Sequence, residues 1–312
     1  MLEERRFPLS DLRLFASPRS EGVTVRACGA ERAVRSINDS ALDDVDIAFF
    51  AAGAPTSRRH APGVAQRGGV AVDKSSAFRM APDVPLVVPE VNAAALQAHC
   101  GIVANPNCMA IPLSIVLAPL HAAFGLRQVT LATYQAASGA GRDLVAELVA
   151  QEGDEAAGRA PEARVYPHVL HRNVVPGGWA MHGDDTDEEL KIAAETRRVL
   201  DMPELAVSVT SVRVPVMIGH SAAVFVELAR PATRDEARDV LSTASGVRVV
   251  DDTSEQRYPT PRNVAGTDDV QVGRIRVDHG RRDGLALFFS ADNLRRGAAT
   301  NAVQVAELLL GG

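Results

Sequence analysis

The sequence of 312 residues has few cysteines, few aromatic residues and no long apolar run. Its three cysteines, Cys28, Cys100 and Cys108, are too few and too scattered for a disulfide framework or a zinc site. No apolar stretch approaches the roughly 20 residues that span a bilayer, and the N-terminus lacks the apolar core of a signal peptide. These absences predict a cytoplasmic protein that has no metal centre and does not associate with membranes.

The sequence also lacks an excess of positive charge. Its formal net charge is -6 at pH 7, and both signs are spread along the chain. Without a basic stripe we expect no binding to nucleic acid, and an anionic substrate would need a local cationic pocket. The hydrophobic content of 46% is ordinary for a globular protein, and the length is sufficient for two domains.

Short apolar runs alternate with segments of helical pattern between Leu12 and Ala104. The runs are LRLFAS, DIAFFAAG, GVAVDKSS, PLVVPEVN and GIVAN. Several end in small or polar residues, as strands do when their carboxyl ends face a ligand crevice. This region predicts a parallel α/β sheet. Residues 2–6 instead resemble the last turn of a helix that Pro8 ends.

The pattern changes after Cys108. It predicts helices over residues 110–125, 141–153, 186–200 and 301–310, and strands over 128–138, 205–216, 221–228, 247–252, 272–278 and 285–293. The later strands are typical of an antiparallel sheet, and the last helix could return to the first domain. An irregular stretch rich in Pro, Gly and His runs from Gly158 to Asp185.

Cys108 is the first candidate for chemistry. The stretch GIVANPNCMAIPLS places it after a Pro-containing turn, at the start of a predicted helix. A helix N-terminus carries about half a positive elementary charge and favours thiolate over thiol. The alternative is a buried structural cysteine, and the residue pattern leaves both interpretations open.

The stretch TYQAASGAGRDLV runs from a predicted strand through a Gly-rich turn into a helix. Gly139 and Gly141 have the G-x-G spacing of a dinucleotide site, but Leu144 occupies the third glycine position. No strand ending in an acidic residue lies about 20 positions on. A tight active-site turn that displays Gln135 therefore fits better.

Three further groups could supply charge or proton transfer. Arg213 and His220 in SVRVPVMIGHS can present a cation and an imidazole from one region. Glu188 and Lys191, three residues apart, share one helical face. Arg79 follows a strand and a Ser-Ser turn, where its guanidinium could grip a phosphate or carboxylate. Each has a plainer alternative: a structural histidine, an exposed ion pair or a surface arginine.

Taken together, these stretches resemble aspartate-semialdehyde dehydrogenase, the family that reduces aspartyl-β-phosphate with NADPH. Its most specific blocks, in chain order, are FASPRSEG, VDKSSAFRMAPDVPLVVPEVN, NPNCMAIPL, YQAASGAG, ELKIAAETRRVL, RVPVMIGHSAAVFVEL and ALFFSADNLRRGAATNAVQVAELL. The resemblance implies an α/β fold: a Rossmann-like NADP-binding domain (1–107 and 294–312) and an inserted α+β catalytic and dimerisation domain (108–293). It also implies a homodimer or tetramer that acts in lysine, threonine and methionine biosynthesis.

The resemblance implies a role for each matched residue. Cys108 is the implied nucleophile that forms a thioester, Gln135 orients this intermediate, and His220 is the acid/base. The implied substrate contacts are Arg213 for the α-carboxylate, Glu188 for the ammonium, and Arg79, Asn107 and Lys191 for the phosphate. The implied cofactor contacts are Ser17, Arg19 and Ser20 for the 2′-phosphate of NADP, Asn293 near the nicotinamide, and in addition Ser138 and Gly139.

Two departures from the family pattern leave alternatives open. Residues 166–190 keep the pattern only in part, with His168, His171 and Trp179 in unexpected places, so we expect no catalytic residue there. Family members also begin with a strand and a G-x-x-G-x-x-G turn that cradles the cofactor pyrophosphate; we expect both to be absent here. The alternatives are a start assigned too late, a non-catalytic homologue deficient in cofactor binding, or an N-acetyl-glutamyl-phosphate reductase.

Overall fold

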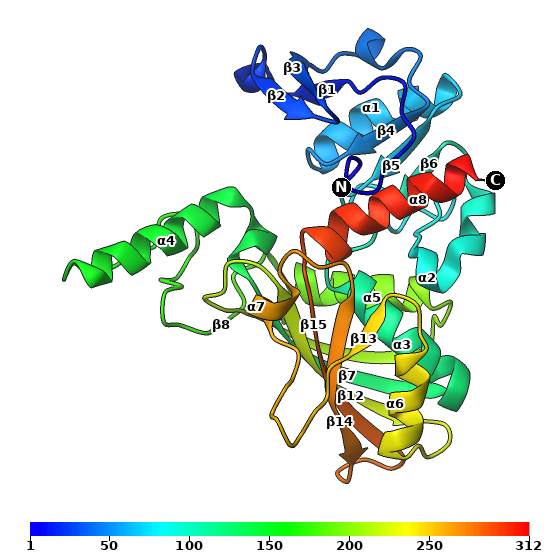
Figure 1. Cartoon of the computed structure of the whole chain (residues 1–312), viewed down its shortest axis with the longest axis vertical. Helices are drawn as coiled ribbons and strands as arrows, with labels where there is room; N and C mark the ends of the chain where they lie inside the picture. Colours follow the sequence, from blue (N-terminus) through cyan, green and yellow to red (C-terminus); the bar gives the residue numbers. More distant parts are fainter. Residues whose placement is uncertain (312) are drawn as a thin grey trace. The chain divides into compact units, whose positions relative to one another are not determined.

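The computed structural model describes residues 1–311, except for the side chains of residues 39 and 40. The chain forms two compact units: unit 1 comprises Met1–Pro106 and Ala299–Gly312, and unit 2 comprises Asn107–Ala298 (Figure 1). The chain returns to unit 1 at Ala299, five residues after position 294, where the implied domain bounds place this return. Arg295 pairs with Asp268 at 2.9 Å and Arg296 donates to the Asp268 carbonyl, which ties this stretch to unit 2.

One sheet of unit 1 is parallel and has the order β4-β5-β6. Its strands are β4 (Ile47–Phe50), β5 (Val70–Asp73) and β6 (Ile102–Ala104). These strands confirm those expected from the apolar runs DIAFFAAG, GVAVDKSS and GIVAN. In PLVVPEVN only an isolated bridge from Leu86 to Ala104 forms, because Pro89 opens the short helix α2 (Pro89–Asn92).

A second sheet of unit 1 has the order β1-β3-β2. Its strands are β1 (Leu14–Ala16), β2 (Thr24–Ala27) and β3 (Ala30–Ser36). β1 and β3 are parallel, whereas β2 and β3 form a hairpin that the sequence analysis did not anticipate. Cys28 and Gly29 make its turn with φ of 49° and 74°. Cysteine is an unusual residue at a position with positive φ, where Asn or Asp would have signalled the turn.

The helices of unit 1 cover both faces of the parallel sheet. They are α1 (Ala54–Gln66), α2 and α8 (Asn301–Leu310), with 3₁₀ turns η1 (Pro18–Ser20), η2 (Asp39–Leu42) and η3 (Ala93–Ala98). Ala71 of β5 packs in one cluster with Val64 of α1, whereas Val72 packs in another with Val305 of α8. Successive strand residues point to opposite faces, so unit 1 has the layered arrangement of a Rossmann-like domain.

The first residues form one turn rather than an assigned helix. The amide of Arg5 donates to the Met1 carbonyl at 3.0 Å, and that of Phe7 donates to the Leu2 carbonyl at 2.9 Å. Arg6 has a φ of 52°, which is how a helical turn of this kind terminates. The Arg5 guanidinium also pairs with Glu307 of α8, within the same unit.

Unit 2 is built on one seven-stranded sheet of order β13-β14-β15-β12-β7-β11-β8. Its strands are β7 (Leu126–Gln135), β8 (Val175–Pro176), β11 (Ala206–Arg213), β12 (His220–Leu228), β13 (Val247–Val249), β14 (Val270–Asp278) and β15 (Gly284–Ala291). The expected antiparallel sheet is mixed instead, because β11 pairs parallel to β7 and β13 parallel to β14. The chain reaches β11 from β7 through two helices, a crossover that parallel pairing requires.

The helices of unit 2 are α3 (Ala110–Phe124), α4 (Arg142–Ala156), α5 (Asp187–Val199), α6 (Arg234–Ser242) and α7 (Pro261–Val264), with η4 (Ala137–Ala140) and a π-helical turn η5 (Arg295–Thr300). Four of them, α3, α5, α6 and α7, pack against the seven-stranded sheet, whereas α4 extends away from it and packs against the irregular stretch that follows (Figure 1). α3, α4, α5 and α8 confirm the expected helices. α6 was not anticipated, although Thr233 and Glu236 form a capping box at its start.

The irregular stretch after α4 is anchored by two residues of that helix. The buried Glu147 carboxylate accepts the amides of Arg164, Val165 and Tyr166. Gln151, one turn later, accepts the amides of Leu170 and His171 at 3.0 Å. The stretch ends in β8 and a two-residue hairpin, β9 (Met181–His182) and β10 (Asp185–Thr186).

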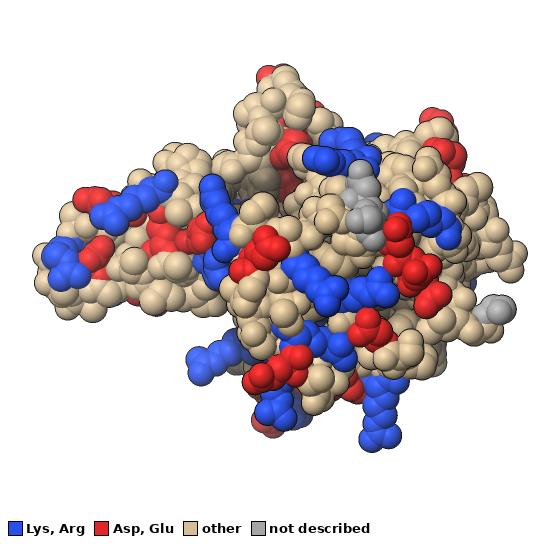
Figure 2. Space-filling model, turned by 90° about the horizontal axis from the view of Figure 1, so that it is seen from above, with Lys and Arg blue, Asp and Glu red and all other residues tan. Residues whose placement is uncertain are grey.

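Charges of both signs are interspersed on the face shown in Figure 2, in keeping with the spread seen along the sequence. Across residues 1–311, no helix combines the length and apolar character needed to cross a membrane.

Candidate active site

The strand register of unit 2 brings three candidate residues to the edge of its sheet at which β7 and β11 end and β12 begins. β7 ends at Gln135, directly opposite Arg213, the last residue of the parallel strand β11. β12 runs antiparallel to β7, so its first residue, His220, lies at the same edge. Residues separated by up to 85 positions therefore meet because of strand direction and register.

The peptide group of Ala136, just beyond β7, contacts two of these side chains. Its amide donates to His220 Nδ1 at 3.0 Å, and its carbonyl accepts from Arg213 Nη1 at 2.8 Å. A Cβ at Gly139 would lie 2.8 Å from His220 Nε2 and 3.0 Å from Arg213 Nη1. Glycine at 139 thus leaves room for both side chains, which explains the turn better than a dinucleotide fingerprint does.

His220 and Arg213 carry buried donors without partners among the described residues. His220 is 0% exposed, and burial together with the Arg213 charge lowers its pKa from 6.5 to about 3. The imidazole is therefore neutral at pH 7, and because Nδ1 accepts the Ala136 amide, its proton resides on Nε2. His220 Nε2 and Arg213 Nε make no hydrogen bond there. Such unpaired buried donors indicate a ligand site.

Glu188 supplies the opposite charge. This buried carboxylate lies in the first turn of α5 and accepts from Gln135 Nε2 at 3.0 Å and from Asn107 Nδ2 at 3.2 Å. A capping box between Thr186 and Glu189 fixes that turn, and Glu189 accepts the Ser211 amide at 2.8 Å. The N-terminus of α5 is thereby held against β11, with Glu188 beside Gln135.

Cys108 is half-buried and lies two residues before α3 begins. The preceding Asn107 accepts the Met109 amide at 2.7 Å, which turns the chain into the helix. A Cβ at Gly297 would lie 3.1 Å from the Cβ of Cys108 and 2.8 Å from its carbonyl oxygen. Sequence pattern alone assigns Gly297 no role, although a glycine within a helical pattern signals close packing of this kind.

Ser138 and Asn293 contact each other at the same end of the sheet. Asn293 Nδ2 lies 2.9 Å from Ser138 Oγ, and Asn293 Oδ1 accepts the Gly219 amide at 2.9 Å. Two of the three candidate cofactor contacts of unit 2, Ser138 and Asn293, therefore belong to one hydrogen-bonded group beside His220, which follows Gly219 in the chain.

Lys191 lies one turn after Glu188 on α5, and its ammonium pairs with Asp187 at 2.5 Å. This pairing is the i,i+4 contact of a helix surface.

The remaining candidates lie in unit 1. Arg79 donates to the carbonyls of Asn105 at 3.0 Å and Lys74 at 2.7 Å, and so links the loops that follow β6 and β5. Arg19 and Ser20 lie in the 3₁₀ turn η1 directly after β1, and Ser17 is its N-cap residue; Ser17 and Arg19 are exposed.

Two aromatic residues from the irregular stretch also contact the site. The ring centroids of Trp179 and Tyr166 lie 4.5 Å and 5.8 Å from Arg213 Cζ. We expected no catalytic residue in this stretch, and no spacing signal connects Trp179 or Tyr166 with Arg213.

Comparison with known proteins defines the class to which this chain belongs. Residues 1–99 match the semialdehyde dehydrogenase NAD binding domain, and residues 117–296 match the semialdehyde dehydrogenase dimerisation domain. The chain thus has the two domains of a semialdehyde dehydrogenase, a class of oxidoreductases.

The relatives narrow this class. Aspartate-semialdehyde dehydrogenase from Prochlorococcus marinus is 42% identical over 311 residues, covering 99% of this chain and 91% of the relative. The enzyme of the same name from Aquifex aeolicus is 43% identical over 315 residues, covering 99% and 93%. The chain belongs to the aspartate-semialdehyde dehydrogenase family, which confirms the resemblance seen in the sequence.

Solved structures agree with this family. Aspartate semialdehyde dehydrogenase II from Vibrio cholerae superposes with a TM-score of 0.95 at 38% identity, covering 99% of this chain and 93% of that one. A probable aspartate-semialdehyde dehydrogenase from Pseudomonas aeruginosa gives a TM-score of 0.92 at 32% identity, covering 99% and 92%. The expected α/β fold class is confirmed, and neither the N-acetyl-glutamyl nor the non-catalytic alternative is favoured.

Proposed function

We propose that the chain catalyses the NADPH-dependent reductive dephosphorylation of L-aspartyl-4-phosphate to L-aspartate 4-semialdehyde, a step toward lysine, threonine and methionine. One observation carries the proposal: two opposite buried charges are held by adjacent residues. Glu188 binds the side chain of Gln135, and Arg213 binds the carbonyl of Ala136. A carboxylate and a guanidinium so placed complement the α-ammonium and α-carboxylate of an amino acid.

The residues around this pair can support acyl transfer. Cys108 Sγ attacks the acyl-phosphate carbonyl, phosphate leaves, and the acyl group is held as a thioester. Gln135 and His220 lie at the sheet edge. They lie beside Glu188 and Arg213, which together form the amino-acid clamp. Because its pKa is lowered to about 3, His220 stays neutral and its Nε2–H can donate to the oxygen on which charge develops. Once hydride has reduced the thioester carbonyl, the C–S bond of the resulting hemithioacetal breaks, which releases the aldehyde and regenerates the Cys108 thiolate. We assign the leaving phosphate to Arg79, Asn107 and Lys191.

The donor sets fit an anionic dinucleotide. Ser17, Arg19 and Ser20 offer hydroxyl and guanidinium donors after β1, which suits the 2′-phosphate of NADP. Ser138 and Asn293 offer a hydroxyl and an amide next to Gly139, and we assign this group to the nicotinamide end. When bound, NADPH supplies the hydride that reduces the acyl group.

We further propose a homodimer. Exposed apolar side chains occur along α4 and the stretch after it: Val149, Val165, Val174 and Met181 are 52–62% exposed. A set of this kind is expected at an interface between subunits, and it lies within the matched dimerisation domain.

The proposal is tested with the purified chain, L-aspartate 4-semialdehyde, phosphate and NADP⁺, by following NADPH formation. Cys108→Ser should lower kcat by at least about 10³-fold, because a hydroxyl cannot replace the thiolate nucleophile. Cys100→Ser is the matched control, since Cys100 is exposed in unit 1, and it should retain full activity. Preference for the N-acetyl-glutamyl substrate, or unchanged turnover in Cys108→Ser, would contradict the proposal.

A further inference from the structure

Trp179, the sole tryptophan of the chain, stacks on the guanidinium of Arg213. Its ring centroid lies 4.5 Å from Arg213 Cζ, and the ring of Tyr166 lies 5.8 Å from the same atom. Arg213 is 2% exposed, whereas Trp179 is half-buried. One face of a buried cation is therefore covered by an indole that itself reaches the surface.

The backbone before Trp179 is built to make this contact. β8 pairs with the end of β11 at Arg213, and two glycines follow it with positive φ, Gly177 at 119° and Gly178 at 84°. A Cβ at Gly178 would lie 2.0 Å from Tyr166 Oη, which donates to the Gly177 carbonyl at 2.7 Å. Burial raises the pKa of the Tyr166 phenol, so this donor persists at neutral pH. The turn thus requires glycine and directs the chain back toward Arg213.

The chain beyond Trp179 leads directly to the other half of the amino-acid clamp. The Ala180 carbonyl accepts the Asp187 amide at 2.8 Å, and β9 and β10 form the hairpin between them. Glu188 follows immediately. A single short segment, residues 176–188, therefore connects the strand paired with Arg213 to the carboxylate of opposite charge.

We propose that Trp179 is a positioning residue for Arg213 and that it sharpens recognition of the substrate α-carboxylate. This inference rests on the proposed function. A ring stacked on the guanidinium face uses none of its N–H donors, which all lie in the guanidinium plane. Arg213 Nη1 is held by Ala136, and Nε has no partner among the described residues. Trp179 fixes the plane and excludes water, so that the Nε edge meets a carboxylate in plane.

The test compares two substrates in the NADP⁺-dependent assay: L-aspartate 4-semialdehyde and 3-aminopropanal, which lacks the α-carboxylate. Trp179→Ala should raise KM for the first by about 3- to 30-fold, with a smaller change in kcat. KM for the second should not change. Trp179→Phe, which keeps an aromatic face, should show a smaller rise in the same direction. An equal rise for both substrates would show a merely structural role and overturn the proposal.

A matched control comes from a second stacked pair in unit 2. Tyr258 lies over Arg274 with its ring centroid 5.2 Å from Cζ and is half-buried like Trp179. Tyr258→Leu should leave both KM values unchanged, and an effect equal to that of Trp179→Ala would count against the proposal. If the wild-type chain turns over neither substrate, the proposed function fails, and this result is distinct from an unchanged KM ratio in an active Trp179→Ala variant.

Tryptophan emission gives a readout that needs no turnover. Because Trp179 is the sole tryptophan, a carboxylate that binds Arg213 should change the whole indole signal. Titration of the wild-type chain with L-aspartate should give a saturable change that Arg213→Leu abolishes. A signal that stays constant under saturating L-aspartate would overturn the proposal.

Discussion

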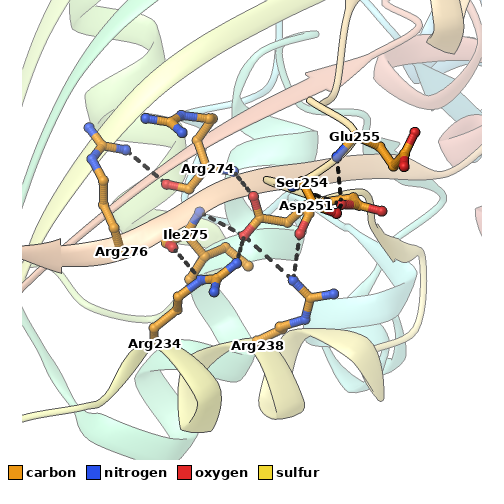
Figure 3. Close-up of polar contacts among 9 residues, drawn as sticks. Arg234, Arg238, Asp251, Ser254, Glu255, Arg274, Ile275 and Arg276 are labelled. Atoms are coloured by element: carbon orange, nitrogen blue, oxygen red, sulfur yellow. Dashed lines mark hydrogen bonds and ion pairs between the residues drawn. The ribbon is translucent and has the colours of Figure 1, made fainter. Parts of the chain in front are cut away.

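Unit 2 contains two buried charged clusters that differ in whether their polar atoms have hydrogen-bond partners. Asp251 accepts the amides of Arg274 at 2.8 Å and Ile275 at 3.3 Å, and pairs with Arg234 at 3.3 Å and Arg238 at 3.7 Å (Figure 3). Both of its oxygens have donors. At the sheet edge, by contrast, Arg213 Nε and His220 Nε2 have no hydrogen-bond partner among the described residues.

The Asp251 cluster satisfies its charge within the fold. β14 shifts register between Gly273 and Arg276, and Arg274 has a φ of 54° at that irregularity. Asp251 accepts the amides that the irregularity leaves without a ladder partner. A saturated cluster stabilises a local conformation, whereas the unsaturated one at the sheet edge keeps donors for a ligand. The two clusters should therefore respond oppositely to mutation.

The largest effect is expected at the unsaturated cluster. Arg213→Leu should lower kcat/KM by about 10²- to 10³-fold, because the substrate carboxylate loses its only buried guanidinium at this edge of the described structure. The free energy of unfolding should not fall, since the variant removes a buried charge that has no carboxylate partner there. Kinetics with L-aspartate 4-semialdehyde and urea denaturation measure the two quantities. A variant that loses stability and retains kcat/KM would remove the distinction between the clusters.

A smaller effect of the opposite kind is expected at Asp251. Asp251→Ala should lower the free energy of unfolding by about 2–3 kcal/mol, since two backbone amides lose their acceptor. Arg234 and Arg238 add little, because their side chains are 40% and 39% exposed. kcat/KM of the folded fraction should not change. Urea denaturation and the NADP⁺-dependent assay check both points.

Asp252→Ala provides the control for the Asp251 variant. Asp252 also accepts from Ser254 and pairs with Arg257, but it lies at the surface and should matter less for stability. A loss of kcat/KM in Asp251→Ala would show that the saturated cluster also supports the site.

The parts of unit 2 that depend on local sequence pattern could be predicted from the sequence. The alternation in residues 128–138 predicts β7, and the apolar run 110–125 predicts α3. Strand direction was misjudged, because alternation is the same in parallel and antiparallel pairs. The β2–β3 hairpin was missed because Cys28 occupies a turn position that rarely holds cysteine.

The candidate site shows the same limit. The residue types of Arg213 and His220 suggest their chemistry, but no pattern reveals that one peptide group, that of Ala136, contacts both. The sequence marks Trp179 only as an unexpected residue without a role, because its stacking depends on a turn of two glycines and on the pairing of a two-residue strand. Contacts between segments distant in sequence need tertiary structure, and the most informative polar contacts here are of that kind.

The last contrast between the two clusters concerns stability in acid. The pKa of His220 is lowered from 6.5 to about 3 in the folded chain, so between these values the unfolded chain binds more protons. The contribution of neutral His220 to the free energy of unfolding should be fully present above pH 6.5. It should fall as the pH decreases, by at most about 1.4 kcal/mol per pH unit. His220→Gln removes this dependence. The difference in unfolding free energy, wild type minus variant, should decrease between pH 7 and about 4, as measured by urea denaturation.

His182→Gln, at an exposed position, controls for the loss of a histidine as such. Acidic groups with lowered pKa, such as Asp278, lose their contribution at lower pH in every variant alike. Parallel curves for wild type and His220→Gln would show that the imidazole is not held neutral, and the contrast between the two clusters would then rest on hydrogen bonding alone.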